Sequence, residues 1–127
     1  MRRQLLALLI GTVGVLMVAG AASAHHAWAV DTTRYITVKG TVTGFNWANP
    51  HVQIFLDVTG PNGAIEKWTV GGPSVSRMTG TGWNKDSVKA GETITATGQR
   101  ATDAPNLMKI DKVIFANGKE LVAYGRL

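Results

Sequence analysis

The sequence predicts a small all-β domain built from antiparallel strands. Apolar and polar residues alternate over several short segments, which is the pattern of strands that bury one face. Turn-forming combinations of glycine with proline or asparagine separate these segments. The chain contains no cysteine, so the domain has to be held together by core packing and not by disulfides.

The first expected strand starts at Ile36 and alternates through Val42. Gly40 and Gly44 interrupt it, as expected where a strand coils or bulges at the corner of a barrel. The second strand follows Pro50, and its apolar positions share one face: Val52, Ile54, Leu56 and Val58. Because residues 60–63 (Gly-Pro-Asn-Gly) form a turn before a third strand over residues 65–70, this pair is expected to be an antiparallel hairpin.

The sheet is then interrupted. Residues 71–73 (Gly-Gly-Pro) break it, residues 74–78 are expected to form a short helical turn, and residues 86–90 are a second candidate. Later strands are expected over residues 93–98, 108–115 and 120–124. Five to six short strands with a helical interruption after the third favour a small antiparallel OB-like barrel. An immunoglobulin-like sandwich is the alternative.

The N-terminus has the pattern of a secretory signal peptide. Arg2 and Arg3 are basic, residues 5–19 are apolar, and Ala22 and Ala24 form a small-residue cleavage pattern. We therefore expect a periplasmic or secreted protein that contacts the membrane only through this segment, before cleavage after Ala24. An uncleaved anchor is the alternative. The expected organisation is a signal peptide over residues 1–24, an N-terminal arm over 25–35 and the β-barrel domain over 36–127.

Composition excludes several functions. Cleavage would lower the formal net charge from +5 to +3, because Arg2 and Arg3 are lost and all eight acidic residues stay. This surplus is weak evidence for acidic partners, and export argues against nucleic acid as a partner. The absence of cysteine excludes thiolate metal sites and cysteine-based redox chemistry.

The three histidines are the candidate metal ligands. His25 and His26 would begin the mature chain, and His51 follows Asn49-Pro50 at the bend between the first two strands. Neutral imidazoles and a terminal amine are nitrogen ligands that suit Cu(II), so copper is favoured over zinc. The alternative is that the terminal histidines are solvated and that His51 caps a turn or hydrogen-bonds a carbonyl.

Asp31 lies close in sequence to the histidine pair and is a candidate acceptor for an imidazole N–H. A local turn role is the alternative that we favour. The other acidic residues fall on expected turns and outward strand positions, and no serine lies in a Gly-x-Ser-x-Gly context. The sequence therefore indicates no catalytic residues.

Four tryptophans are many for so short a domain. Trp68, inside the third strand, is expected to pack in the core. Trp47 and Trp83 flank turns, and they are candidates for the rim of a ligand-binding cleft, with packing as the alternative.

One further pattern spans the mature chain. It consists of the His-His start, Asp31, the Trp-Ala-Asn-Pro-His element of residues 47–51, and segments 73–83 and 89–98. Together these elements resemble a family of small exported bacterial proteins, the domain-of-unknown-function family numbered 6152, and the resemblance implies export and fold but no activity. A looser similarity, carried by His25 and His51, is to periplasmic copper-resistance proteins and histidine-brace copper enzymes.

The leading interpretation is an exported, non-enzymatic binding module whose site gathers His25, His26 and His51 and binds copper. Its alternative is a metal-independent ligand- or protein-interaction barrel with Trp47 and Trp83 at the cleft, and a copper-dependent oxidising enzyme is the third. The partner is expected to be a periplasmic protein or a small ligand, and the sequence does not name it.

Overall fold

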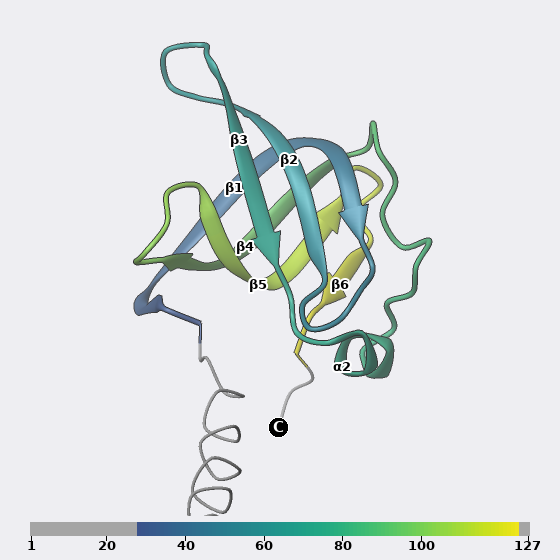
Figure 1. Ribbon diagram of the computed structural model, residues 1–127. Helices are drawn as coiled ribbons and strands as arrows, with labels where there is room; N and C mark the ends of the chain where they lie inside the picture. The colour runs from purple at the N-terminus through teal and green to yellow at the C-terminus, as the bar shows by residue number, and fades with distance from the viewer. Residues whose placement is uncertain (1–27, 125–127) are drawn as a thin grey trace, which may run out of the picture.

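The computed structural model describes residues 28–124, so the expected signal peptide and the terminal histidine pair lie outside the described residues. The elements along the chain are β1 (Val30–Asn46), β2 (Gln53–Thr59), β3 (Ile65–Gly71), α2 (Val75–Gly80), β4 (Thr93–Ala101), β5 (Leu107–Phe115) and β6 (Glu120–Val122) (Figure 1). The predicted all-β class is confirmed, with six strands, mostly antiparallel, and one short helix in the described part of the chain.

The strands pair in the order β3-β2-β1-β4-β5-β6. β3 also pairs with β5, in parallel, with Thr69 to Gly71 opposite Leu107 to Lys109. This additional pairing joins the two ends of the run β3-β2-β1-β4-β5, so these strands form a closed ring, and β6 pairs with β5 outside it. Such closure is the property that the expected OB-like barrel requires, because it leaves no free edge on β3.

β1 belongs to both halves of the ring. It pairs with β4 over Tyr35 to Thr41 and with β2 over Thr41 to Asn46, with an irregularity between Val42 and Gly44. The bulge expected near Gly44 is therefore present.

β1 also starts earlier than the sequence predicts. Val30 pairs with Ala101 at the end of β4, and the Thr102 N–H donates to the Ala29 carbonyl at 2.9 Å. Residues 30–35, which were expected in the N-terminal arm, are thus part of the strand. The extra length of β4 provides the backbone partners that make this extension possible.

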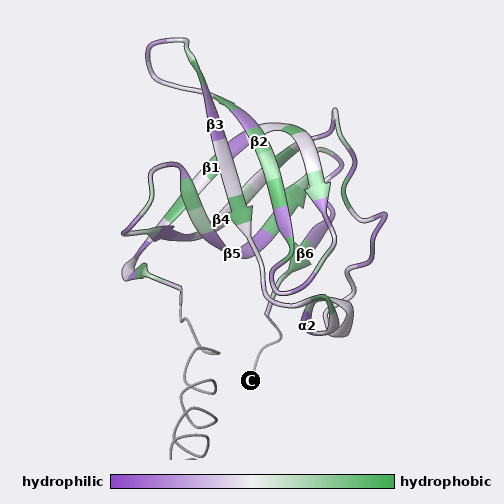
Figure 2. Ribbon diagram, viewed as in Figure 1, coloured by the Kyte–Doolittle hydropathy of each residue, from purple (hydrophilic) through white to green (hydrophobic). Residues whose placement is uncertain are grey.

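The core lies inside the ring and follows the predicted alternation. Val52, directly before β2, and Ile54 and Leu56 on the expected face of β2 are each 1% exposed, and Trp68 is buried on β3 as expected. In Figure 2, apolar and polar positions alternate along the strands. No polar side chain among residues 28–124 is buried, so apolar packing holds the described domain together.

α2 lies at one end of the ring and places Met78 in the core. The second helical candidate, residues 86–90, does not form a helix but consists of turns and bends, beginning with a turn that is closed by the hydrogen bond from the Ser87 N–H to the Asn84 carbonyl. Within residues 28–124, no helix has the length and apolar character needed to cross a membrane.

Candidate functional site

His51 lies in the loop between β1 and β2, directly after the cis peptide bond Asn49-Pro50. Its Nδ1 atom is 3.2 Å from the carbonyl oxygen of Gly72. Because a carbonyl can only accept, Nδ1 is a protonated nitrogen in this contact, and in the neutral ring the lone pair is then on Nε2. Metal-binding imidazoles commonly have this arrangement, in which one ring nitrogen is held by the backbone and the other is left to bind.

The rest of the Asn-Pro-His element fixes this geometry. The Asn49 side-chain oxygen accepts from the Val75 N–H at 3.0 Å and so caps the start of α2, whose own N-cap residue, Ser74, makes no capping hydrogen bond with its side chain. The Gly72 N–H donates to the Val52 carbonyl at 2.7 Å, and the Val52 N–H donates to the Pro73 carbonyl at 3.1 Å. The β1–β2 loop is therefore fastened to the segment between β3 and α2, and the His51 ring sits on a rigid support.

Trp28 packs on His51. The two ring centroids are 4.8 Å apart and the planes meet at 60°, an edge-on arrangement. The indole also lies over Gly71, where an added Cβ would overlap it. Sequence reasoning did not single out this pair, because Trp28 lies in a segment without periodicity and its partners are far along the chain.

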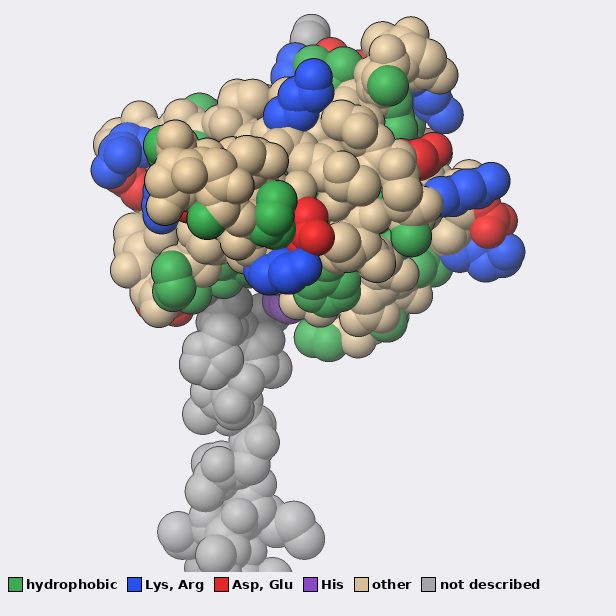
Figure 3. All heavy atoms as spheres, turned by 90° about the horizontal axis from the view of Figure 1, so that it is seen from above, with side chains coloured by type: hydrophobic (Ala, Val, Ile, Leu, Met, Phe, Trp, Pro, Cys, Tyr) green, Lys and Arg blue, Asp and Glu red, His purple; other side chains and the backbone are tan. Residues whose placement is uncertain are grey.

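An open groove of about 630 Å³ lies beside this pair. Six side chains that matter for its chemistry line it, and they come from segments far apart in the sequence. They are Trp28 before β1, His51 in the β1–β2 loop, Arg77 on α2, Gln99 on β4, Lys109 on β5 and Tyr124 at the end of the described chain. None of the residues that line it is acidic. Elsewhere, basic and acidic side chains are interspersed, as on the face shown in Figure 3.

Two cations meet at Tyr124. The Arg77 guanidinium lies 5.8 Å and the Lys109 ammonium 4.9 Å from the centroid of its ring, both within cation–π range. Burial raises the pKa of the Tyr124 phenol, and the charge of Arg77 opposes part of that rise. The phenol therefore stays protonated at neutral pH and keeps its O–H as a hydrogen-bond donor.

Asp31 has the local role that the sequence favoured. Its Oδ1 atom accepts from the Thr33 N–H at 2.9 Å and from the Thr33 hydroxyl at 2.6 Å. Its Oδ2 atom is 4.0 Å from the Nε atom of Arg34. The hydrogen bonds from Thr33 lower the pKa of the Asp31 carboxyl, with a smaller contribution from the charge of Arg34. A contact with His25 or His26 lies outside the described residues.

The cleft-rim assignment of Trp83 is wrong. Trp83 is 2% exposed and donates from Nε1 to the Val122 carbonyl at 2.7 Å, so the indole is core with its one polar atom satisfied. Trp47 is half-buried and packs against the core beside Phe45, with ring centroids 5.8 Å apart. The aromatic residues that line the groove are Trp28 and Tyr124.

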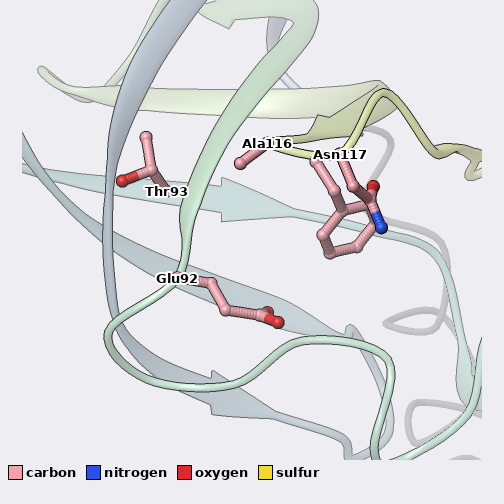
Figure 4. Close-up of a pocket in the computed structure, with 5 residues that line it drawn as sticks. Glu92, Thr93, Ala116 and Asn117 are labelled. Atoms are coloured by element: carbon pink, nitrogen blue, oxygen red, sulfur yellow. The ribbon is translucent and has the colours of Figure 1, made fainter.

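A second hollow, of about 220 Å³, lies where the chain enters β4 and leaves β5 (Figure 4). Its one ionisable side chain, Glu92, already accepts from the Lys89 N–H at 2.9 Å. The groove beside His51 is larger and carries charged groups without such partners. It is therefore the better candidate site.

Within residues 28–124, no three histidine, aspartate or glutamate side chains come together as a metal site. Of the three predicted metal ligands, the structure places His51 alone, and His25 and His26 lie outside the described residues.

The sequence model of a family of unknown function (DUF6152) matches residues 13–107, which is more than half of the chain. The chain belongs to this family. The match includes the Asn-Pro-His element and the strands from β1 to β4, so the resemblance expected from the sequence is confirmed. No curated protein matches the chain at a significant level.

Proposed function

We propose that the mature protein is an exported, periplasmic binding module that holds Cu(II) between His51 and the terminal residues His25 and His26. The observation that supports this most is the contact between His51 Nδ1 and the Gly72 carbonyl. It fixes the ring on the loop between two strands and leaves Nε2 as the nitrogen that can bind the metal.

The position of Trp28 supports the participation of the terminal histidines. His26 and His25 precede Trp28 by two and three residues, so an extended chain puts their Cα atoms at most ~7 and ~11 Å from that of Trp28. Trp28 itself contacts the His51 ring. Cleavage after Ala24 would add the terminal amine to the same set of nitrogen ligands, which suits Cu(II).

The positive charges of the groove oppose the binding of Cu(II). Arg77 and Lys109 line it together with His51, and both repel a dication. The imidazole and amine nitrogens must outweigh that repulsion, so we expect binding to depend on several of them at once. A site that used the terminal residues alone would lack a ligand held by the barrel, and its affinity would fall by the entropic cost of ordering all of its ligands.

Isothermal titration of the processed protein with Cu(II) tests the proposal. We expect one equivalent to bind, and His51→Ala to weaken binding by about tenfold or more, as losing a metal ligand or its orienting partner does. Adding one alanine before His25 should also weaken binding, because it separates the terminal amine from the His25 ring.

As a control, circular dichroism should show that both variants have the same fold as the wild-type protein. Equal copper affinity for the wild-type protein and His51→Ala would show that the terminus binds as a free His-His peptide does. The three-histidine site would then be abandoned.

A second candidate function is favoured by the groove itself. Trp28 and Tyr124 line a space large enough for a small molecule without any metal. In that case, the module binds an organic ligand or a protein segment, and titration with copper gives no saturable heat of binding.

A further inference from the structure

We infer that the groove is also a binding site for a small anion, whose carboxylate or phosphate oxygens are held by Arg77 and Lys109. This inference goes beyond the proposed copper site and does not depend on it, because the cations, the phenol and the groove all belong to the metal-free protein.

Arg77 and Lys109 form no ion pair with the acidic side chains of the described chain. All eight acidic side chains of the sequence lie between Asp31 and Glu120, inside the described range. The ion pairs among them use other cations: Arg34 with Asp31, Lys67 with Asp57, Lys85 with Asp86, and Lys112 with Glu120. Within the described range, Arg77 and Lys109 have no carboxylate within 4.0 Å.

The fold brings the two cations together from separate elements. Arg77 comes from the last turn of α2, and the start of that helix is fixed by the Asn49 cap. Lys109 comes from β5, where it is paired with Gln99 of β4 and with Gly71 of β3. Both reach the ring of Tyr124. Cations placed by rigid elements lose less freedom on binding than cations on free loops.

The groove has the size and the lining of a small-molecule site. A volume of about 630 Å³ lies within the range of small-molecule sites. Ser74 and Gln99 also line it and, with Tyr124, add neutral hydrogen-bond donors beside the two charges. Charge-assisted hydrogen bonds from such cations are the strong interactions of carboxylates and phosphates.

One carboxylate limits where the anion lies. Asp111 shares an adjoining hollow with Lys109 and Tyr124 but does not line the groove itself. It repels an anion on its own side of Tyr124, so the bound oxygens should lie toward Arg77 and the Trp28–His51 pair.

The test uses the processed, metal-free protein and two probes, inorganic phosphate and citrate, at constant ionic strength with chloride as the reference salt. Binding is followed by amide chemical shifts. We expect saturable shifts at Arg77, Lys109 and Tyr124 with at least one probe. The probe that binds more tightly tells whether phosphate or carboxylate is the preferred chemistry.

The key variant is the double substitution Arg77→Gln and Lys109→Gln, which should weaken binding by at least about tenfold, because each removes a charge-assisted hydrogen bond. The charge-matched control is Lys89→Gln with Lys119→Gln, which removes the same net charge away from the groove and should leave the affinity unchanged. Thermal denaturation checks that both variants fold.

Equal weakening in both double variants, or shifts that never saturate with either probe, would overturn the anion site, since non-specific attraction explains such results. Adding one alanine before His25 separates the two proposals, because it should weaken copper binding while leaving the lining of the groove, and so the anion affinity, unchanged. Anion binding without copper binding would remove only the metal proposal, and copper binding without anion binding would remove only this one.

Discussion

Asn49 and His51 are two residues apart, and each holds a different part of the same loop in place. Asn49 caps α2, and His51 is held by the Gly72 carbonyl. Sequence reasoning identified both as parts of an unusual element. It could not identify their partners, because these lie 26 and 21 residues further along the chain, and no local pattern specifies such a contact.

The cap can be tested by stability. Asn49→Ala removes the acceptor of the Val75 N–H, and the free energy of unfolding should fall by about 1 kcal/mol, as for other lost N-caps. Urea denaturation measures it. Asn46→Ala, at the exposed end of β1, is the control and should change little. If the two variants are equally stable, the cap contributes nothing.

Asp31 provides a pH test. Its pKa in the folded protein is lower than the usual 3.8 because of the hydrogen bonds from Thr33. Folding therefore favours the charged form, so this group's contribution to stability is present above pH 3.8 and is lost as the pH falls through the folded-state pKa.

An NMR titration of the side-chain carboxyl measures this shift. We expect a midpoint below 3.8, and Thr33→Val should move it back up, because it removes the hydroxyl donor and keeps the backbone donor. A wild-type midpoint at or above 3.8 would contradict the assigned hydrogen bonds.

At the scale of elements, alternation predicted the buried face of β2 because burial of one face imposes a period of two. It failed at the start of β1, where Thr32, Thr33 and Arg34 are all exposed and the pairing with β4 is irregular. It also misplaced Trp83. Position beside a turn does not show whether an indole points outward, and here the Val122 carbonyl satisfies its N–H inside the core.

Gly98 tests the closeness of β4 and β5. The register shifts between Thr97 and Gly98, and an added Cβ at Gly98 would overlap the backbone carbonyl of Lys109. Because neither strand can move freely, Gly98→Ala should lower the free energy of unfolding by about 1 to 3 kcal/mol. Gly80→Ala is the control, since a Cβ there meets nothing within 4 Å. Thermal denaturation in which both variants match the wild-type protein would show that β4 and β5 have room for the added atom.

At the scale of the molecule, closure of the ring creates the groove. The parallel pairing of β3 with β5 sets Gly71 opposite Lys109, and α2 adds Arg77 at the same end of the ring. A sequence that specifies each strand does not state which ends meet, because that depends on the strand order. The groove could therefore not be predicted from the sequence, although His51, which lines it, was predicted as a candidate ligand.

Export and cleavage of the signal peptide are predictions about the whole chain. N-terminal sequencing of the protein recovered outside the cytoplasm should give His25 as the first residue, since that bond follows the Ala-x-Ala pattern. A different first residue would remove the terminal amine from the proposed copper site. Retention of the whole chain in the membrane fraction would contradict cleavage.

The central claim is that His51 and the mature terminus bind one Cu(II) together, and paramagnetic broadening tests it most directly. Cu(II) added below one equivalent to the processed, isotope-labelled protein should erase the amide signals of Trp28, His51 and Gly72, because these residues surround the proposed site. The signals of Asn117 and Gly118, in the β5–β6 turn, should persist. Broadening confined to residues 25–27, with the signals of His51 and Gly72 intact, would contradict the account.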